Sequence, residues 1–495
     1  MDARQGLWYE FDMRIFKGAL FGPNETIFPS AGMTLLTGLS ERLKRSIMES
    51  LTKPLARNER DPEDSQPYVE LFREAPEGLY VPRYYWRDDI GLEVGPCRVQ
   101  FEPLDAGDFK HTLAYPPREH QLAVCADLDS LGGADVGIQA PCGFGKTYLA
   151  AYAISRVEGR ALIIVPNNNK ASEWRKEIAR FLNLDPAQIG TIQADICKWR
   201  EYPVVIAMMK TMSMRDFPPE LVKAFAVTIV DEAHLSTASK ISRALGKMAG
   251  QRIFLTATPG RGVRREVVDL HCGGRWLRPQ AETTHCRFEF LPVPVWTRFQ
   301  ELEWEQLSTL IGRDFKYVDV AAKVTAQLLA QGRRVLVVNH QIEPLCRVHA
   351  ATGEKGGFVI GRESLKNVAK SFPALRQMLE SRPESSWPKR ADAYMTEVKQ
   401  HMNPILGIGL TKTQPAGTGM DVANLDGGVI MLPVASPDMV TQLRGRWERP
   451  HPDKKPPVIV VLVPDTSDGR ARAQTMQASL RRAGHTIFEH PPMTL

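Results

Sequence analysis

The sequence has no uninterrupted apolar run approaching the roughly 20 residues that a membrane-spanning helix needs. Its first residues, Met1–Gln5, also lack the apolar core of a secretory signal peptide. Cysteine is scarce, with 7 in 495 residues, and the cysteines are scattered and never spaced as Cys-x-x-Cys. Such usage is typical of a reducing compartment. These absences predict a soluble protein without a membrane partner, which is cytoplasmic, or nuclear if its source has a nucleus.

Two dipeptides, His271-Cys272 and His285-Cys286, contain residue types that bind metals. Two histidines and two cysteines could form a tetrahedral zinc site. However, ligands that are adjacent in the chain seldom converge on one ion. We therefore expect these residues to be buried or incidental.

The composition is that of an ordinary folded protein, with 43% hydrophobic and 24% charged residues. The net charge of +6 is compatible with a polyanionic partner but does not by itself indicate one. A chain of 495 residues exceeds the size of one hydrophobic core, so two or three domains are expected.

From residue 108 onward, apolar runs of strand length alternate with helical stretches, which is typical of parallel sheets. Two such series follow one another, and the proline-containing segment Arg278–Pro294 separates them. The predicted fold class is α/β, with two tandem parallel-sheet domains and a small N-terminal α+β domain. The predicted domains span residues 1–107, 108–285 and 286–495.

The stretch Ala140–Thr147 (APCGFGKT) follows an apolar run and opens into a helical pattern. A glycine turn between strand and helix points backbone N–H groups at one spot, and the helix adds its positive end. Lys146 and Thr147 would complete a phosphate and magnesium site. Taken alone, the stretch could also be an ordinary glycine turn, and Ala140 replaces the first glycine of the strict pattern. The expected nucleotide contacts are Pro141, Cys142, Gly143, Phe144, Gly145, Lys146 and Thr147.

An apolar strand then ends on two carboxylates in Thr228–His234 (TIVDEAH). Ligand sites of α/β proteins lie at such carboxyl ends of strands. Asp231 can hold magnesium opposite Thr147, and Glu232 can orient and deprotonate the attacking water. The alternative interpretation of the acidic pair is a helix cap.

Two further stretches carry hydroxyls and cations. In Phe254–Pro259 (FLTATP), the hydroxyls of Thr256 and Thr258 could hydrogen-bond to the acidic pair. In Gln442–Arg449 (QLRGRWER), Arg446 and Arg449 are three residues apart and would share one face of a helix. Aimed at the phosphate loop, they would stabilise the transferring phosphate; in isolation, a solvated basic helix is the alternative.

The patterns AxxGxGKT, DEAH, TATP and QxxGRxxR, in this order and with these gaps, resemble a superfamily 2 helicase over about residues 108–465. The resemblance implies two RecA-like domains with ATP and Mg²⁺ bound between them. It implies catalytic roles for Glu232, Lys146, Arg446, Arg449 and Gln442, and coupling roles for His234, Thr256 and Thr258. Trp447 and Glu448 are unusual within the last pattern and leave the aim of Arg449 open.

The same resemblance extends to weaker patterns. It implies nucleotide contacts by Arg118, Gln121, Gly419 and Asp421. The nucleic-acid contacts that it implies are Pro166, Asn167, Trp174, Lys210, Thr211, Asn339, His340, Gly417 and Thr418.

The segment Glu74–Arg83, which precedes Arg118-x-x-Gln121, is similar to phage UvsW-like, poxviral and XPB-like DNA helicases. This similarity implies a DNA translocase that remodels branched DNA, in the host cytoplasm if phage-encoded, with an N-terminal domain that engages DNA. An RNA helicase or transcript-release factor, and the motor subunit of a restriction nuclease, stay open as alternatives. The alternating aromatics and arginines of Leu79–Arg87 could stack bases, but we favour a small hydrophobic core.

Overall fold

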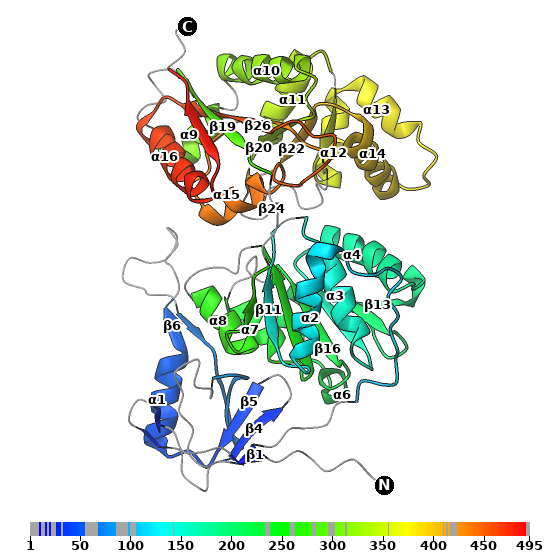
Figure 1. Cartoon of the computed structure of the whole chain (residues 1–495), viewed down its shortest axis with the longest axis vertical. Coiled ribbons are helices and arrows are strands. Elements are labelled where there is room, and N and C mark those ends of the chain that lie inside the picture. Colours follow the sequence, from blue (N-terminus) through cyan, green and yellow to red (C-terminus); the bar gives the residue numbers. More distant parts are fainter. Residues whose placement is uncertain are drawn as a thin grey trace. The chain divides into compact units, whose positions relative to one another are not determined.

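The computed structural model divides the chain into two compact units, Met1–Ala281 and Glu282–Leu495 (Figure 1). The sequence predicts this boundary at residues 285–286, and the three-domain division stays a prediction. The residues that the structure describes are 9–10, 15–16, 19–20, 26–30, 33–54, 68–85, 98–99, 105–141, 143–232, 238–257, 263–279, 284–295, 302–311, 314–354, 356–408, 410–411, 414–415, 422 and 424–491.

The first unit contains an eight-stranded sheet in the order β14-β13-β15-β12-β16-β17-β11-β18. All neighbouring strands run parallel except the hairpin pair β13 and β14. In chain order the strands are β11 (Val136–Gln139), β12 (Ala161–Val165), β13 (Ile189–Gln193), β14 (Ile196–Lys198), β15 (Val204–Met208), β16 (Val227–Asp231), β17 (Gln251–Thr256) and β18 (Trp276–Leu277).

Helix α2 precedes the first strand of this sheet, and the other helices of the sheet lie between later strands in the chain. The helices are α2 (Leu122–Ser130), α3 (Lys146–Ser155), α4 (Asn168–Phe181), α5 (Met209–Met214), α6 (Pro219–Val222), α7 (Ala238–Leu245) and α8 (Val263–Cys272). Strand β12 is buried along its whole length because both faces of the sheet are covered. Ile163 and Val165 enter a core with α2, α3 and α4, whereas Leu162 and Ile164 enter a core with α5, α7 and α8. This alternation follows from the two-residue period of a strand.

The N-terminal residues form a smaller α+β structure. Its six-stranded sheet has the order β1-β10-β4-β5-β9-β8, and α1 (Glu41–Leu51) follows β5. The strands of the N-terminal part are β1 (Tyr9–Glu10), β2 (Ile15–Phe16), β3 (Ala19–Leu20), β4 (Thr26–Ser30), β5 (Met33–Thr37), β6 (Thr52–Pro54), β7 (Tyr68–Glu70), β8 (Arg73–Ala75), β9 (Gly78–Pro82) and β10 (Arg98–Val99).

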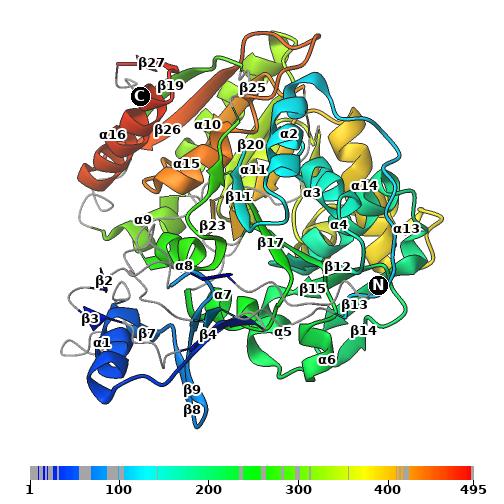
Figure 2. The ribbon, with the colours of Figure 1, turned by 60° about the horizontal axis from the view of Figure 1, so that its bottom comes forward.

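This N-terminal structure shares a hydrophobic core with the large sheet. Leu36, Ile47 and Leu79 belong to the same buried cluster as α5, α7 and α8. Figures 1 and 2 show it on the side of the sheet that carries α7 and α8. Leu79, Val81 and Tyr85 are buried, which confirms the core interpretation for the described part of Leu79–Arg87. Trp86 and Arg87 lie outside the described residues.

Arg83 joins the two parts of this unit through polar contacts. Its guanidinium donates to Asp135 Oδ2 at 2.8 Å and to the carbonyl oxygen of Gly250 at 2.8 Å. Both partners lie at the amino ends of strands, because Asp135 precedes β11 and Gly250 precedes β17. The N-terminal part is therefore attached at the edge of the sheet opposite to the carboxyl ends.

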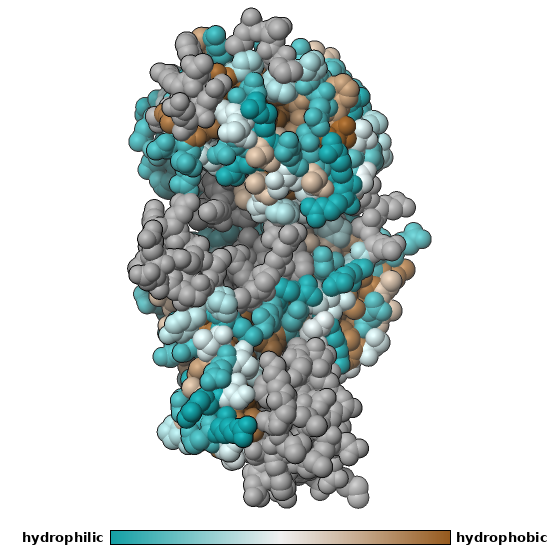
Figure 3. Space-filling view, turned by 90° about the vertical axis from the view of Figure 1, so that its left-hand side faces the viewer, coloured by the Kyte–Doolittle hydropathy of each residue, from teal (hydrophilic) through white to brown (hydrophobic). Residues whose placement is uncertain are grey.

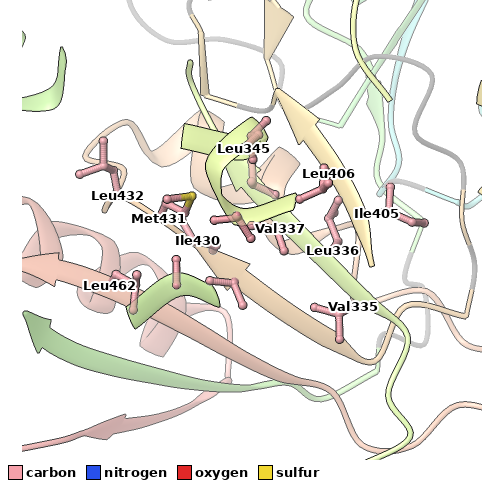
Figure 4. Close-up of a cluster of buried hydrophobic side chains, with 14 of the residues drawn as sticks. Val335, Leu336, Val337, Leu345, Ile405, Leu406, Ile430, Met431, Leu432 and Leu462 are labelled. Atoms are coloured by element: carbon pink, nitrogen blue, oxygen red, sulfur yellow. The ribbon is translucent and has the colours of Figure 1, made fainter. Parts of the chain in front are cut away.

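The second unit contains a seven-stranded sheet in the order β21-β22-β20-β25-β26-β19-β27, and every neighbouring pair is parallel. The strands of this sheet are β19 (Arg287–Val293), β20 (Val335–Asn339), β21 (Gly357–Val359), β22 (Ile405–Ile408), β25 (Gly427–Ile430), β26 (Val458–Pro464) and β27 (Thr486–Glu489). A separate hairpin joins β23 (Leu410–Thr411) and β24 (Gln414–Pro415). Figure 4 shows side chains of β20, β22 and β25 meeting in the core.

The helices of the second unit are α9 (Trp304–Ile311), α10 (Phe315–Ala330), α11 (Ile342–Ala351), α12 (Arg362–Ser371), α13 (Pro373–Glu380), α14 (Trp387–His401), α15 (Pro437–Arg444) and α16 (Ser467–Arg482). Two parallel sheets in tandem, preceded by a small α+β part, confirm the predicted fold class.

Among the described helices, none combines the length and apolarity that a bilayer-crossing segment requires. On the face drawn in Figure 3, hydrophilic and hydrophobic residues are interspersed over the described surface. Scattered apolar side chains are ordinary on a protein surface in contact with water.

Candidate nucleotide site

The phosphate loop lies between β11 and α3, as the sequence predicts. Gly143 and Gly145 have φ angles of +85° and +93°, a left-handed conformation that favours glycine. Ala140 is fully buried, and its N–H donates to the carbonyl oxygen of Thr256 at 3.0 Å. A small residue at the first position of the loop therefore fits this structure. Cys142 lies outside the described residues.

Lys146, at the start of α3, folds back over this loop. Its Nζ donates to the carbonyl oxygens of Ala140 at 3.0 Å and Pro141 at 3.3 Å. Thr147 follows in the first turn of α3. The ammonium group and the positive end of the helix therefore meet at the loop, which is the arrangement of a phosphate site.

Gln121 connects the upstream pattern to the same loop. Its Nε2 donates to the carbonyl oxygen of Phe144 at 3.0 Å, and its Oε1 accepts from the N–H of Arg118 at 3.0 Å. A Cβ at Gly145 would lie 2.3 Å from this Nε2, so the close approach itself requires glycine. The buried Gln121 amide is thus part of the loop's support, while Arg118 is exposed.

Neighbouring strands bring the acidic pair and Thr256 to this loop. Strands β16, β17 and β11 are consecutive in the sheet, with Asp231 opposite Leu255 and Thr256 opposite Gln139. Thr256 Oγ1 donates to Glu232 Oε2 at 3.3 Å. The predicted contact between this hydroxyl and the acidic pair is therefore present. Thr258 and His234 lie outside the described residues.

Glu232 has an unusual backbone conformation. Its φ angle is +48°, in the left-handed region that non-glycine residues rarely adopt. Such strain costs on the order of 1 kcal/mol and is found at functional sites. The N–H of Glu232 donates to the carbonyl oxygen of Leu255 at 2.9 Å, which holds this turn against β17.

Asp231 is buried, with 5% of its surface exposed. Burial raises its pKa to about 6, and the ammonium groups of Lys170 and Lys146 oppose that increase. Its Oδ2 accepts a hydrogen bond from Trp174 Nε1 at 2.7 Å. A buried carboxylate that loses hydration is stabilised by a cation, so Asp231 and the Thr147 hydroxyl fit Mg²⁺, which prefers oxygen ligands.

The predicted nucleic-acid residues of the first unit fall into two groups. Pro166 and Asn167 follow β12, and Lys210 and Thr211 begin α5 after β15, its neighbour in the sheet. These four residues therefore lie together at the carboxyl edge. Trp174 differs, because its indole is 3% exposed and bonds to Asp231. Little of the Trp174 side chain is exposed in this structure, and its role as a nucleic-acid contact stays a prediction.

In the second unit, Asn339 is buried at the end of β20. Its Oδ1 accepts from the N–H of Gln341 at 3.0 Å, so it caps the turn before α11. His340 is half-buried, and burial lowers its pKa. The predicted residues Gly417, Thr418, Gly419 and Asp421 lie outside the described residues.

The arginine pair does not lie on a helix as expected. Helix α15, which carries Gln442, ends at Arg444, and Arg446 and Arg449 lie in the turn beyond it. Trp447 anchors this turn: it is fully buried, and its Nε1 donates to the carbonyl oxygen of Gly427 at 2.8 Å. A Cβ at Gly428 in β25 would lie 2.6 Å from the Trp447 ring, so only glycine fits at this position.

Glu448 and Lys454 fix the same turn from two other directions. Glu448 Oε1 lies 2.6 Å from His485 Nε2 and also accepts a hydrogen bond from Arg444. Lys454 Nζ donates to the carbonyl oxygen of Arg449 at 2.9 Å and also to that of Trp447. The unusual Trp447-Glu448 pair is therefore the anchor of the arginine turn. The sequence shows that these two residues are unusual within the QxxGRxxR pattern, but it does not indicate which residues they contact.

The remaining candidate metal residues belong to different units of the chain. His271 and Cys272 are buried in the first unit, where His271 Nδ1 lies 3.0 Å from Arg252 Nη1. His285 and Cys286 belong to the second unit, and His285 Nε2 lies 2.8 Å from Thr486 Oγ1. The described residues contain no cluster of three or more side chains suited to a metal ion.

A glycine phosphate loop beside a strand-end Asp-Glu pair defines the first unit as a P-loop α/β domain of the RecA-like class. The family model described as "Type III restriction enzyme, res subunit" matches residues 114–261. The S. cerevisiae Dbp5 protein bound to Gle1 aligns over 76% of this chain and 90% of its own, with a TM-score of 0.50 and 12% identity. At that identity the likeness concerns the fold alone.

Two curated relatives are similar in sequence. The putative DNA 3'-5' helicase Rad25 of Halobacterium salinarum is 31% identical over 201 residues, or 40% of this chain and 31% of its own. The DNA 3'-5' helicase XPB of Kineococcus radiotolerans is 29% identical over 206 residues, or 36% of this chain and 37% of its own. The chain thus spans about a third of these relatives. The resemblance to superfamily 2 helicases is confirmed.

Proposed function

We propose that this chain is an ATP-driven motor that translocates along DNA and remodels branched structures such as forks, Holliday junctions and R-loops. The observation that carries the proposal is the convergence of Lys146, the Asp231-Glu232 pair and Thr256 at one sheet edge. This set of groups is suited to hydrolysis of a nucleotide γ-phosphate. The relatives named as DNA helicases support DNA as the track.

In this proposal, Lys146 and the loop N–H groups bind the ATP phosphates. Thr147 and Asp231 hold the magnesium ion, which neutralises charge on the phosphate oxygens when bound. Glu232 orients the attacking water and accepts its proton. Thr256, bonded to Glu232 Oε2, keeps that carboxylate in position. Gly419 and Asp421 stay predicted nucleotide contacts.

Arg446 and Arg449 are proposed to stabilise negative charge on the transferring phosphate. The support for this role is the way their turn is built. A buried tryptophan, a buried glutamate and Lys454 all hold that turn, which is more than a solvated basic segment requires. Gln442 is proposed to act with them.

The nucleic-acid path is proposed to follow the carboxyl edges of the sheets. In the first unit, the proposed contacts with the nucleic-acid strand are Pro166, Asn167, Lys210 and Thr211. In the second unit, they are Asn339, His340, Gly417 and Thr418. Contacts of this kind are made to the sugar-phosphate backbone of the nucleic acid, so binding should depend on salt and show little sequence preference. A cytoplasmic location stays a prediction.

A motor subunit for a restriction nuclease is a second candidate, because the matching family model carries that description. The described residues contain no clustered metal-binding carboxylates, so the nuclease chemistry would come from a partner. Co-purification of a nuclease with the chain tests this candidate.

The deciding experiment uses labelled forks, four-way junctions and R-loops, together with RNA duplexes, in the presence and absence of ATP. The Glu232→Gln variant is the matched control because it keeps the fold and the net binding surface. We expect ATP-dependent remodelling of the DNA junctions by the wild-type chain only. Exclusive action on RNA would replace DNA by RNA as the substrate, and no action on any substrate would refute the motor.

A further inference from the structure

Helix α4 turns two side chains toward the acidic pair. Trp174 Nε1 donates to Asp231 Oδ2 at 2.7 Å, and the indole is 3% exposed. Lys170 lies one helical turn earlier, and residues four apart share a face of a helix. Both side chains therefore approach the carboxylates from the same side.

The surroundings of Lys170 are strongly anionic. Its Nζ lies 3.1 Å from Glu173 Oε2. Burial alone would lower the pKa of Lys170, but the charges of Asp231, Glu173 and Glu232 raise it. The ammonium group thus stays charged within electrostatic reach of both residues of the acidic pair. None of the sequence patterns singles out this lysine.

The beginning of the same helix lies at the predicted nucleic-acid edge. Asn167 caps α4, and its Oδ1 accepts from the N–H of Lys170 at 3.0 Å. Pro166 and Asn167 directly follow β12. A single helix therefore has the predicted nucleic-acid contacts at its beginning and the Asp231 contact, made by Trp174, about two turns later.

We propose that Trp174 and Lys170 are positioning residues that tie the magnesium-binding carboxylate to the nucleic-acid edge. A hydrogen bond to one oxygen of Asp231 fixes the rotation of the carboxylate and thereby the direction of the other oxygen. A bound nucleic-acid strand that shifts the start of α4 then changes the orientation of the Asp231 carboxylate. The inference rests on the proposed function, because it takes Asp231 as the magnesium ligand.

The first test is Trp174→Phe, which keeps the aromatic ring and removes the N–H donor. The readout is equilibrium binding of a fluorescent, non-hydrolysable ATP analogue during a magnesium titration. Loss of one hydrogen bond to a charged group should raise the half-saturating magnesium concentration about tenfold. Binding of the analogue in EDTA should be unchanged, since the phosphate loop is intact.

The matched control is Trp199→Phe. Trp199 is also buried in the first unit, where it packs against Phe225 and the guanidinium of Arg160. It tests the general effect of exchanging indole for phenyl in this unit. Identical magnesium titrations for the two variants would overturn the role of Trp174.

The second test is Lys170→Gln, with Lys176→Gln as control. Lys176 is exposed on the same helix. The readout is the ratio of ATP turnover with and without nucleic acid. We expect this ratio to fall about tenfold for Lys170→Gln, because a positive charge that acts on Asp231 and Glu232 is lost. Equal ratios in the two lysine variants would overturn the coupling.

These outcomes separate the inference from the proposed function. A wild-type chain without nucleic-acid-stimulated turnover would refute the motor, while the magnesium titration would still decide the Trp174–Asp231 contact. A stimulated wild type with a normal Lys170→Gln ratio would refute the coupling alone. If Trp174→Phe does not fold, Lys170→Gln decides, because its side chain is not part of the hydrophobic core.

Discussion

The acidic pair of the first unit and the arginine turn of the second are held in place by different means. Asp231 and Glu232 end a central strand, so the hydrogen-bonded sheet itself positions them beside Thr256. Arg446 and Arg449 lie beyond the end of a helix, in a turn without such a ladder. The buried Trp447 and Glu448, together with the half-buried Lys454, anchor that turn instead. Substitutions at the acidic pair should therefore change chemistry, whereas those around the arginines should also change stability.

The largest effect is expected from Glu232→Gln. The amide cannot accept a proton from water, so turnover should fall about a thousandfold or more while ATP affinity persists. Steady-state ATPase assays and nucleotide titrations measure both quantities. A normal turnover number in a folded variant would remove Glu232 from the catalytic role.

Arg446→Ala should reduce turnover about a thousandfold. The physical reason is the loss of a positive charge that acts on the transition state rather than on bound ATP. Comparison of the turnover number with the dissociation constant for ATP checks this distinction. Equal losses in both would assign Arg446 to ground-state binding.

Trp447→Phe tests the anchor of the turn. It removes the hydrogen bond to Gly427 and some buried volume, so the free energy of unfolding should fall by about 1–3 kcal/mol. Denaturant titration measures the change. Trp387→Phe is a matched control, since its indole N–H has no partner among the described residues. A variant of Trp447 as stable as this control would show that the indole does not anchor the turn.

The smallest effect concerns pH. Burial lowers the pKa of Lys454 to about 8 from its ordinary 10.5. Between these values the unfolded chain binds more protons than the folded one, so this group makes stability rise with pH. Below pH 8 the buried charge costs free energy in full. Lys454→Met should reduce the increase of the free energy of unfolding between pH 8 and 10.5 by less than about 1 kcal/mol, because the group is partly hydrated. An unchanged pH slope of the unfolding midpoint would exclude Lys454 as its source.

Local features of the chain are well predicted from sequence. The phosphate loop depends on glycines that tolerate positive φ angles, as at Gly143 and Gly145. The parallel strands follow from apolar runs that are buried on both faces, such as Ala161–Val165. These features involve neighbours in the chain, so their residue types alone specify them.

The side-chain partners of distant segments required the tertiary structure. Trp174 belongs by pattern to a nucleic-acid contact, yet it bonds to Asp231, 57 positions away. Trp447 and Glu448 look like irregularities, yet they meet Gly427 and His485. The N-terminal strands share a core with α5, α7 and α8.

The sequence by itself thus determined which elements form and which chemical groups stand at strand ends, because backbone conformation and periodicity are local. Only the tertiary structure decided what Trp174, Lys170 and Trp447 contact. Helix rotation and the packing of remote strands set those contacts, and no local pattern encodes the direction in which a buried side chain points.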